Sequence, residues 1–90
     1  MKKAIITSRK DNVATLLESV EKGDMISITG EGRFKIVANE KISKGHKIAL
    51  KDFNKNENVI KYGAIIGITT KKICEGYHVH THNIKGRETE

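Results

Sequence analysis

Short apolar runs separated by turn-forming residues extend over most of the chain, and this pattern is the strongest constraint on its fold. Gly, Asn or charged residues interrupt the runs, which recur roughly every ten residues. The runs cover residues 25–29, 34–38, 47–51, 58–62, 64–70 and 77–81, after a β-branched run at 3–7. Such spacing is typical of a compact β-sandwich or barrel. We therefore expect a mostly β fold with several short strands, a hairpin at Gly30-Glu31-Gly32, and sharp bends at Gly63 and Gly67.

One segment, residues 11–22, has a different period. Its apolar residues are spaced i, i+3, i+4 and i+7, as on one stripe of a helix; they are Val13, Leu16, Leu17 and Val20. Asp11 can cap the first free amides, and Gly23 can end the helix in the left-handed conformation. The pattern predicts one short amphipathic helix within the mostly β fold.

The length of 90 residues limits what the chain can do alone. It corresponds to a single domain, residues 1–90, in which the charged tail at about 85–90 is expected to be loose. A domain of this size buries too little surface to shape a deep substrate pocket. A part of an enzyme is therefore a better interpretation than a complete enzyme.

Charge and composition narrow the choice of partner. Lys and Arg number 17 against 11 Asp and Glu, and the formal charge of +6 is spread along the chain. This indicates either a solvated surface or attraction to an anion. With two Phe, two Tyr and no Trp, no stacking platform for nucleic acid is visible.

The lone Cys74 cannot form an internal disulfide, which fits a reducing compartment. The N-terminus lacks the apolar core of a signal peptide, and no stretch is long and apolar enough to cross a membrane. We expect a cytoplasmic protein with no membrane or nucleic-acid partner. Association into a homo-oligomer stays open.

The run Gly76-Tyr77-His78-Val79-His80-Thr81-His82-Asn83 holds three of the four histidines. On an extended strand, His78, His80 and His82 project to one side. Two histidines at i and i+2 can chelate a divalent cation, and His80 with His82 is the preferred metal pair. Imidazole also suits general acid–base catalysis near neutral pH. The alternative is an exposed strand that merely carries polar imidazoles.

The fourth histidine lies in Gly45-His46-Lys47, at the entry to a predicted strand. His46 and Lys47 can bind a substrate carboxylate, although a solvated loop is the alternative. The sequence holds no glycine-rich phosphate loop, no Cys-x-x-Cys and no nucleophilic serine arrangement. Its glutamates lie in predicted turns without clear convergence, so a partner chain is expected to complete the site.

These motifs, taken in order, resemble the N-terminal domain of the altronate and galactarate dehydratase family. The resemblance runs from about residue 11 to 83, and is carried by residues 11–14, 45–50, 59–63, 66–67 and 78–83. It implies an SAF domain of β-clip architecture. The family removes water from sugar acids to give 2-keto-3-deoxy products, helped by a divalent metal such as iron or manganese, and a related branch eliminates sulfite from sulfolactate. The chain ends seven residues after Asn83, so it resembles the form that is a separate small subunit.

The resemblance implies a division of labour with a large catalytic subunit, which supplies most of the metal site and the base. His80 and His82 would serve as metal ligands or as the acid, while His46 and Lys47 would hold the carboxylate of an anionic sugar acid or order a lid. Three positions depart from the family pattern, Asn56, Ala64 and Tyr77. The alternatives are a sulfolactate sulfo-lyase small subunit, a non-catalytic carbohydrate-binding SAF module and, last, a nucleic-acid-binding β-barrel.

Overall fold

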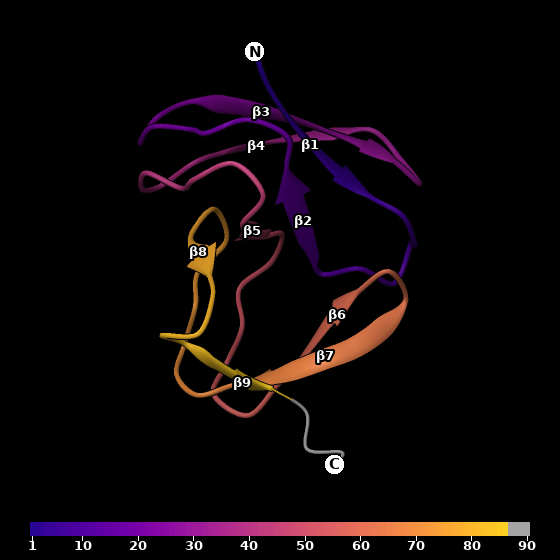
Figure 1. Cartoon of the computed structure of the whole chain (residues 1–90), viewed down its shortest axis with the longest axis vertical. Coiled ribbons are helices and arrows are strands. Elements are labelled where there is room, and N and C mark those ends of the chain that lie inside the picture. Colours follow the sequence, from indigo (N-terminus) through magenta and orange to yellow (C-terminus); the bar gives the residue numbers. More distant parts are fainter. Residues whose placement is uncertain (87–90) are drawn as a thin grey trace.

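The computed structural model describes residues 1–86, which form nine β-strands and no helix (Figure 1). The strands are β1 Lys2–Ile6, β2 Val13–Leu16, β3 Met25–Gly30, β4 Phe34–Val37, β5 Lys47–Ala49, β6 Asn58–Lys61, β7 Ala64–Thr69, β8 His78–Val79 and β9 Ile84–Gly86. Six strands form one sheet in the order β4-β3-β1-β2-β5-β8, and three form a second in the order β6-β7-β9. Within residues 1–86 no helix capable of spanning a membrane occurs. The mostly β prediction is therefore correct.

The helix predicted for residues 11–22 is wrong, because this segment contains β2. Strand β2 pairs antiparallel with β1 and with β5. Val13 packs in one apolar cluster, whereas Ala14 and Leu16 pack in the other. A strand buried on both faces carries apolar residues at irregular intervals, and these imitate the stripe of a helix. Leu17, which a helix would bury, is 47% exposed.

Asp11, predicted to cap that helix, instead accepts hydrogen bonds from two turns. Its Oδ2 accepts hydrogen bonds from the backbone N–H groups of Thr7 and Ser8, at 3.1 and 3.3 Å. Its Oδ1 accepts one from Gly63 N–H of the β6–β7 hairpin, at 2.8 Å. The neighbouring Asn12 accepts from Ile60 N–H at 2.7 Å. These two residues therefore join the six-stranded sheet to the three-stranded one.

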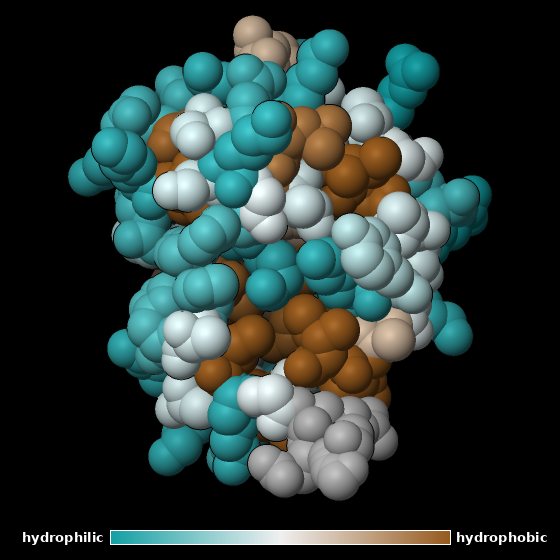
Figure 2. Space-filling view, in the orientation of Figure 1, coloured by the Kyte–Doolittle hydropathy of each residue, from teal (hydrophilic) through white to brown (hydrophobic). Residues whose placement is uncertain are grey.

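Two apolar clusters lie on either side of the shared strands β2 and β5. The larger cluster includes Ile26, Ile28 and Ile48, and is built mainly by β1 to β4. The smaller one surrounds Phe53 and includes Val79 of β8. On the face in Figure 2, hydrophilic residues cross the middle of the molecule between apolar areas of the two halves. Val79 of β8 packs in the smaller cluster, and β8 pairs with β5, so both halves of the fold contribute to the position of the histidine segment.

The turns agree with the predictions in most places. Strands β3 and β4 pair antiparallel across Gly30-Glu31-Gly32, as expected. Tyr62 and Gly63 have φ of 56° and 77°, as a two-residue hairpin turn with positive φ at both positions requires. Asn56, one of the departures from the family pattern, has φ of 69°, a left-handed conformation that asparagine tolerates. Gly67, expected at a bend, lies inside β7 instead.

The last strand was not predicted. Lys85 and Gly86, expected to begin a loose tail, belong to β9 and pair with Ile68 and Gly67 of β7. The rest of that predicted tail, residues 87–90, lies outside the described residues.

Candidate functional site

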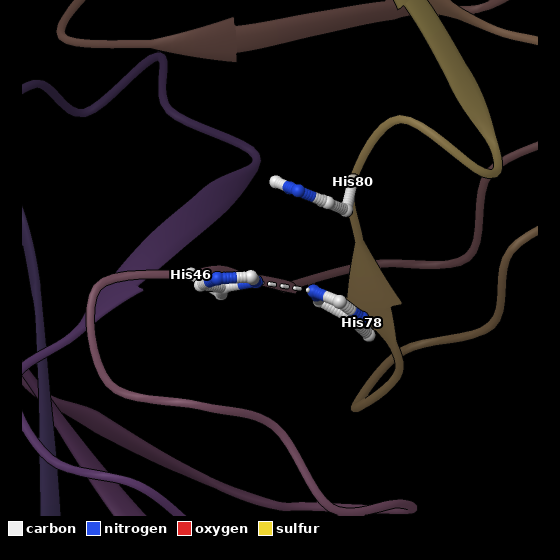
Figure 3. Close-up of side chains that lie close together, drawn as sticks. All are labelled: His46, His78 and His80. Atoms are coloured by element: carbon white, nitrogen blue, oxygen red, sulfur yellow. Dashed lines mark hydrogen bonds between the residues drawn. The ribbon is translucent and has the colours of Figure 1, made fainter.

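The pairing of β5 with β8 brings together histidines that lie far apart in the sequence. Lys47 pairs with Val79, and Ile48 with His78, in antiparallel register. The same register, continued by one residue, places His46 opposite His80. Because side chains alternate along a strand, His46, His78 and His80 project from the same face (Figure 3).

The three imidazoles form a compact group, called the histidine cluster below. His46 Nδ1 and His78 Nε2 are 2.9 Å apart and share a hydrogen bond. The rings of His46 and His80 stack with centroids 4.5 Å apart, and those of His78 and His80 lie 5.3 Å apart. One ring nitrogen from each residue lies within 4.8 Å of the others. All three side chains are half-buried.

His82 lies beside this cluster but outside the group of converging nitrogens. Strand β8 ends at Val79, and residues 81–83 form a turn. The straight run of three imidazoles predicted on one strand is therefore interrupted. The His82 ring still packs against His78, with centroids 5.1 Å apart, and its side chain is exposed.

Asn83 holds the turn in place. Its Oδ1 accepts from His80 N–H at 2.9 Å, and its Nδ2 donates to His78 C=O at 2.7 Å. Its own backbone N–H donates to His80 C=O at 3.0 Å. Asn83 is 5% exposed. This one buried side chain therefore fixes the backbone positions of two cluster residues, His78 and His80.

Glu40 and Gly76 also hold β8 in place. Glu40 Oε2 accepts from His78 N–H at 2.9 Å. Gly76 has φ of 87°, and a Cβ there would come within 2.5 Å of Val37 O. Only glycine fits this close approach without displacement. The contacts of β8 are thus made chiefly by hydrogen bonds and close backbone approach.

Two of the cluster residues, His78 and His80, have electrostatic surroundings that favour the neutral imidazole. The pKa of His78 is lowered by burial first and then by the positive charges of His82, His46 and His80, while Glu40 partly opposes this. The pKa of His80 is lowered by burial and by His46, Lys47 and His82. A histidine must be neutral to offer a lone pair to a metal ion. The lowered pKa values of His78 and His80 therefore favour the neutral state that ligation needs.

Lys47 alternates with the cluster histidines along the strand and pairs with Val79, so its side chain projects from the opposite face of the sheet. Burial lowers its pKa, and the charge of Lys61 lowers it further. Its own charge contributes to the lowered pKa of His80. Among residues 1–86, the ion pairs are Lys2–Glu18, Arg9–Glu31 and Lys51–Glu57, so Lys47 has no carboxylate partner there. A half-buried cation without a partner is suited to binding an anion.

The donor set fits a divalent transition metal. Two imidazole nitrogens bound to one ion lie about 3–3.5 Å apart, because each metal–nitrogen bond is about 2.0–2.1 Å. The cluster nitrogens already lie within 4.8 Å of one another, so small ring movements suffice. Imidazole ligands suit zinc, copper, nickel and iron, whereas manganese prefers oxygen ligands. The residues present therefore fit iron better than manganese.

The site residues predicted from the sequence and the residues that the structure brings together overlap without being identical. His80 and His46 are in the cluster, and His82 is at its margin. Lys47 projects from the opposite face of β5, although its charge still acts on His80. His78 had been placed on the same face but not chosen as a ligand. Glu40 and Asn83 were missed. No spacing in the sequence reveals that Glu40 hydrogen-bonds to a distant strand, or that Asn83 hydrogen-bonds to the backbone of its own turn. Only the juxtaposition of glycine and histidine at 45–46 signalled His46.

Fold and site together define a small all-β module that presents an imidazole cluster at the edge of a sheet. Residues 2–87 match the family described as the altronate/galactarate dehydratase SAF domain, and the chain belongs to this family. The resemblance seen in the sequence motifs is thereby confirmed.

The similar proteins are of two kinds. The chain is 36% identical over 85 residues to an altronate dehydratase of Bacillus subtilis, covering 94% of this chain and 16% of that protein. It is 39% identical over 75 residues to the altronate dehydratase of Escherichia coli, covering 83% and 14%. It is also 36% identical over 73 residues to the (2R)-sulfolactate sulfo-lyase subunit alpha of Chromohalobacter salexigens, covering 78% of each. The chain thus spans about a sixth of the altronate dehydratases but most of the sulfo-lyase subunit.

Proposed function

We propose that this chain is the small subunit of a metal-dependent hydro-lyase that acts on a sugar acid, and that it completes the active site of a large subunit. The observation that carries the proposal is the convergence of His46, His78 and His80 at one exposed edge. Membership in the dehydratase SAF family supports the reaction class. A cluster built only of imidazoles at the surface of a small domain is suited to sharing a metal ion with a second chain.

Each residue has a defined task in this proposal. The cluster nitrogens would hold a divalent ion, with iron favoured over manganese. When bound, this ion supplies positive charge that stabilises the negative charge developing beside the substrate carboxylate. Lys47 binds a substrate carboxylate through its ammonium group.

The proton balance assigns a role to His82. A base on the large subunit removes the proton from the carbon next to the carboxylate. The hydroxyl on the following carbon leaves as water, taking a proton from His82, and the resulting enol becomes the 2-keto-3-deoxy acid. His82 suits this step because it is exposed and lies 5.1 Å, ring to ring, from His78. The acid is thus kept separate from the three nitrogens that face the metal.

A second candidate is the small subunit of a sulfolactate sulfo-lyase. It is favoured by the coverage of 78% of the Chromohalobacter salexigens alpha subunit, and by a similar match to that of Paracoccus pantotrophus. The same residues would serve, with sulfite leaving in place of water. A cytoplasmic location and the absence of nucleic-acid and membrane partners stay predictions.

The test is reconstitution of this chain with a large dehydratase-type subunit, measuring bound metal and turnover of altronate, galactarate and sulfolactate. We expect His46→Ala and His78→Ala to lower metal affinity at least tenfold and to abolish turnover. His82→Ala should lower turnover at least a hundredfold while metal content is kept, since general acids contribute about 10²–10⁴-fold. Unchanged metal content and turnover in His46→Ala and His78→Ala would refute the metal role. Binding of neutral sugars without any lyase activity would instead support a non-catalytic SAF module.

A further inference from the structure

A surface hollow of about 270 Å³ opens on the His82 side of the histidine cluster. Its lining includes Lys71, Lys72, Tyr77 and His82, together with Glu40 and Asn83. Glu40 and Asn83 also hold the backbone of β8. The cluster residues themselves do not line the hollow, but the hollow lies beside the segment that carries His78 and His80.

The polar groups of this hollow are mostly donors. Lys71 and Lys72 are exposed and make no ion pair within residues 1–86. Glu40, the one acidic lining residue, already accepts a hydrogen bond from His78 N–H. The oxygen and the nitrogen of the Asn83 side-chain amide already form hydrogen bonds with the backbone of His80 and His78. The free donors are thus the two ammonium groups, the Tyr77 hydroxyl and His82.

The loop that carries the lysines is fixed relative to the histidines. Thr70 N–H donates to Asn83 C=O at 2.9 Å, which ties the start of this loop to the histidine turn. Ile73, at its end, forms an isolated bridge with Phe53, a fully buried residue of the smaller apolar cluster. Because both ends are anchored, the positions of Lys71 and Lys72 beside His82 are set by the fold.

We propose that this hollow is a subsite in which Lys71 and Lys72 bind an acidic end group of a small hydroxylated acid, whose neighbouring carbons then lie against His82. The inference rests on the proposed function and adds the position of the substrate to it. The volume lies just below the ~300–1,000 Å³ of pockets for drug-sized ligands, so a smaller molecule fits. The Tyr77 hydroxyl can bind a ligand hydroxyl or share the charge.

A further cation, Lys47, influences which acids this subsite prefers. The charge of Lys47 acts on His80 although its side chain projects from the opposite face of β5, whereas the hollow begins at His82. An acid with charged groups at both ends can bind the lysine pair with one group while the other lies in the positive field of Lys47. Galactarate and sulfolactate have two acidic groups, while altronate has one. The subsite therefore favours a diacid over a monoacid.

The test is an NMR titration of the metal-free 90-residue chain with galactarate, altronate, sulfolactate and the neutral galactitol. We expect galactarate to shift the amide signals of residues 70–73 and 82–83, and to bind at least five times tighter than altronate and ten times tighter than galactitol. Lys71→Ala/Lys72→Ala should weaken galactarate binding at least tenfold. Lys22→Ala/Lys55→Ala, which removes the same charge from exposed positions outside the hollow, should change it less than twofold.

The outcomes separate this inference from the proposed function. Equal weakening by the two double variants, equal binding of galactitol, or shifts confined to other residues would overturn the subsite. If sulfolactate binds more tightly than galactarate, the group bound by Lys71 and Lys72 is a sulfonate. If galactarate binds more tightly, the group is a carboxylate. A parallel titration with Fe²⁺ tests the cluster alone, since Lys71→Ala/Lys72→Ala should retain metal binding whether or not galactarate binds.

Discussion

Strands β2 and β8 both pair with β5, on its two sides, yet different forces hold them in place. β2 is buried on both faces and contributes to both apolar clusters. β8 has two residues and buries only Val79, while Asn83, Glu40 and Gly76 fix its backbone by hydrogen bonds and close approach. Apolar burial is non-directional, whereas hydrogen bonds define orientation. The strand that maintains the fold is thus held by burial, and the strand that positions imidazoles is held by directional contacts.

The largest expected effect tests whether this segment buries its apolar side chains as a strand or as the helix predicted from the sequence. Leu16→Ala removes a side chain that is 1% exposed, and should lower the free energy of unfolding by about 3 kcal/mol because it leaves a cavity. Leu17→Ala, at the neighbouring position, is the matched control. It should cost no more than about 0.5 kcal/mol, because Leu17 is 47% exposed. Urea denaturation measures both, and equal losses would argue for a helical stripe that buries both leucines.

Asp11→Ala tests the hydrogen-bonded link between the sheets. It should cost about 2 kcal/mol at pH 7, because the backbone N–H groups of Thr7, Ser8 and Gly63 lose a charged acceptor. Burial would raise the pKa of Asp11, but hydrogen bonds from the backbone of Gly63, Thr7, Tyr62 and Ser8 outweigh it and lower the pKa below 3.8. A lowered folded-state pKa contributes stability that is present above 3.8 and lost as the pH falls through the folded value.

The measurement is urea denaturation of wild type and Asp11→Ala between pH 7 and pH 2. The gap between the two proteins should narrow below pH 3.8 as the wild-type carboxylate is protonated. Asp11→Asn keeps one acceptor oxygen without the charge, so its stability should lie between the two at pH 7. A gap that stays constant to pH 2 would show that the charge of Asp11 contributes nothing.

Asn83→Ala should change the site more than the fold. We expect a loss of about 1–2 kcal/mol in unfolding free energy, since two backbone groups lose their partner. Metal affinity should fall by about 10–100-fold, as for other residues that orient metal ligands. Asn58→Ala, at an exposed position in β6, is the control and should alter neither quantity. Normal affinity in a destabilised Asn83→Ala would show that β8 is positioned by burial after all.

Much of the fold could be predicted because most strands carry their own local signals. The β-branched runs and the Gly63 turn predicted β3, β4, β6 and β7 within one or two residues at each end. The error at residues 11–22 has a physical cause, since a strand shared by two cores places apolar residues on both faces. Strand β9 was missed because its residues Ile84, Lys85 and Gly86 carry little apolar signal. Its partner β7 supplies the missing hydrogen bonds.

By itself, the sequence determined the family, the β character of the chain and the region of chemistry, because motif order and the density of histidines in residues 78–82 are local properties. Only the tertiary structure decided which imidazoles meet. The register of β5 on β8 places His46 opposite His80, and the turn held by Asn83 moves His82 to the margin. Pairing between segments more than thirty residues apart depends on the summed packing of both cores. No spacing within one segment encodes it.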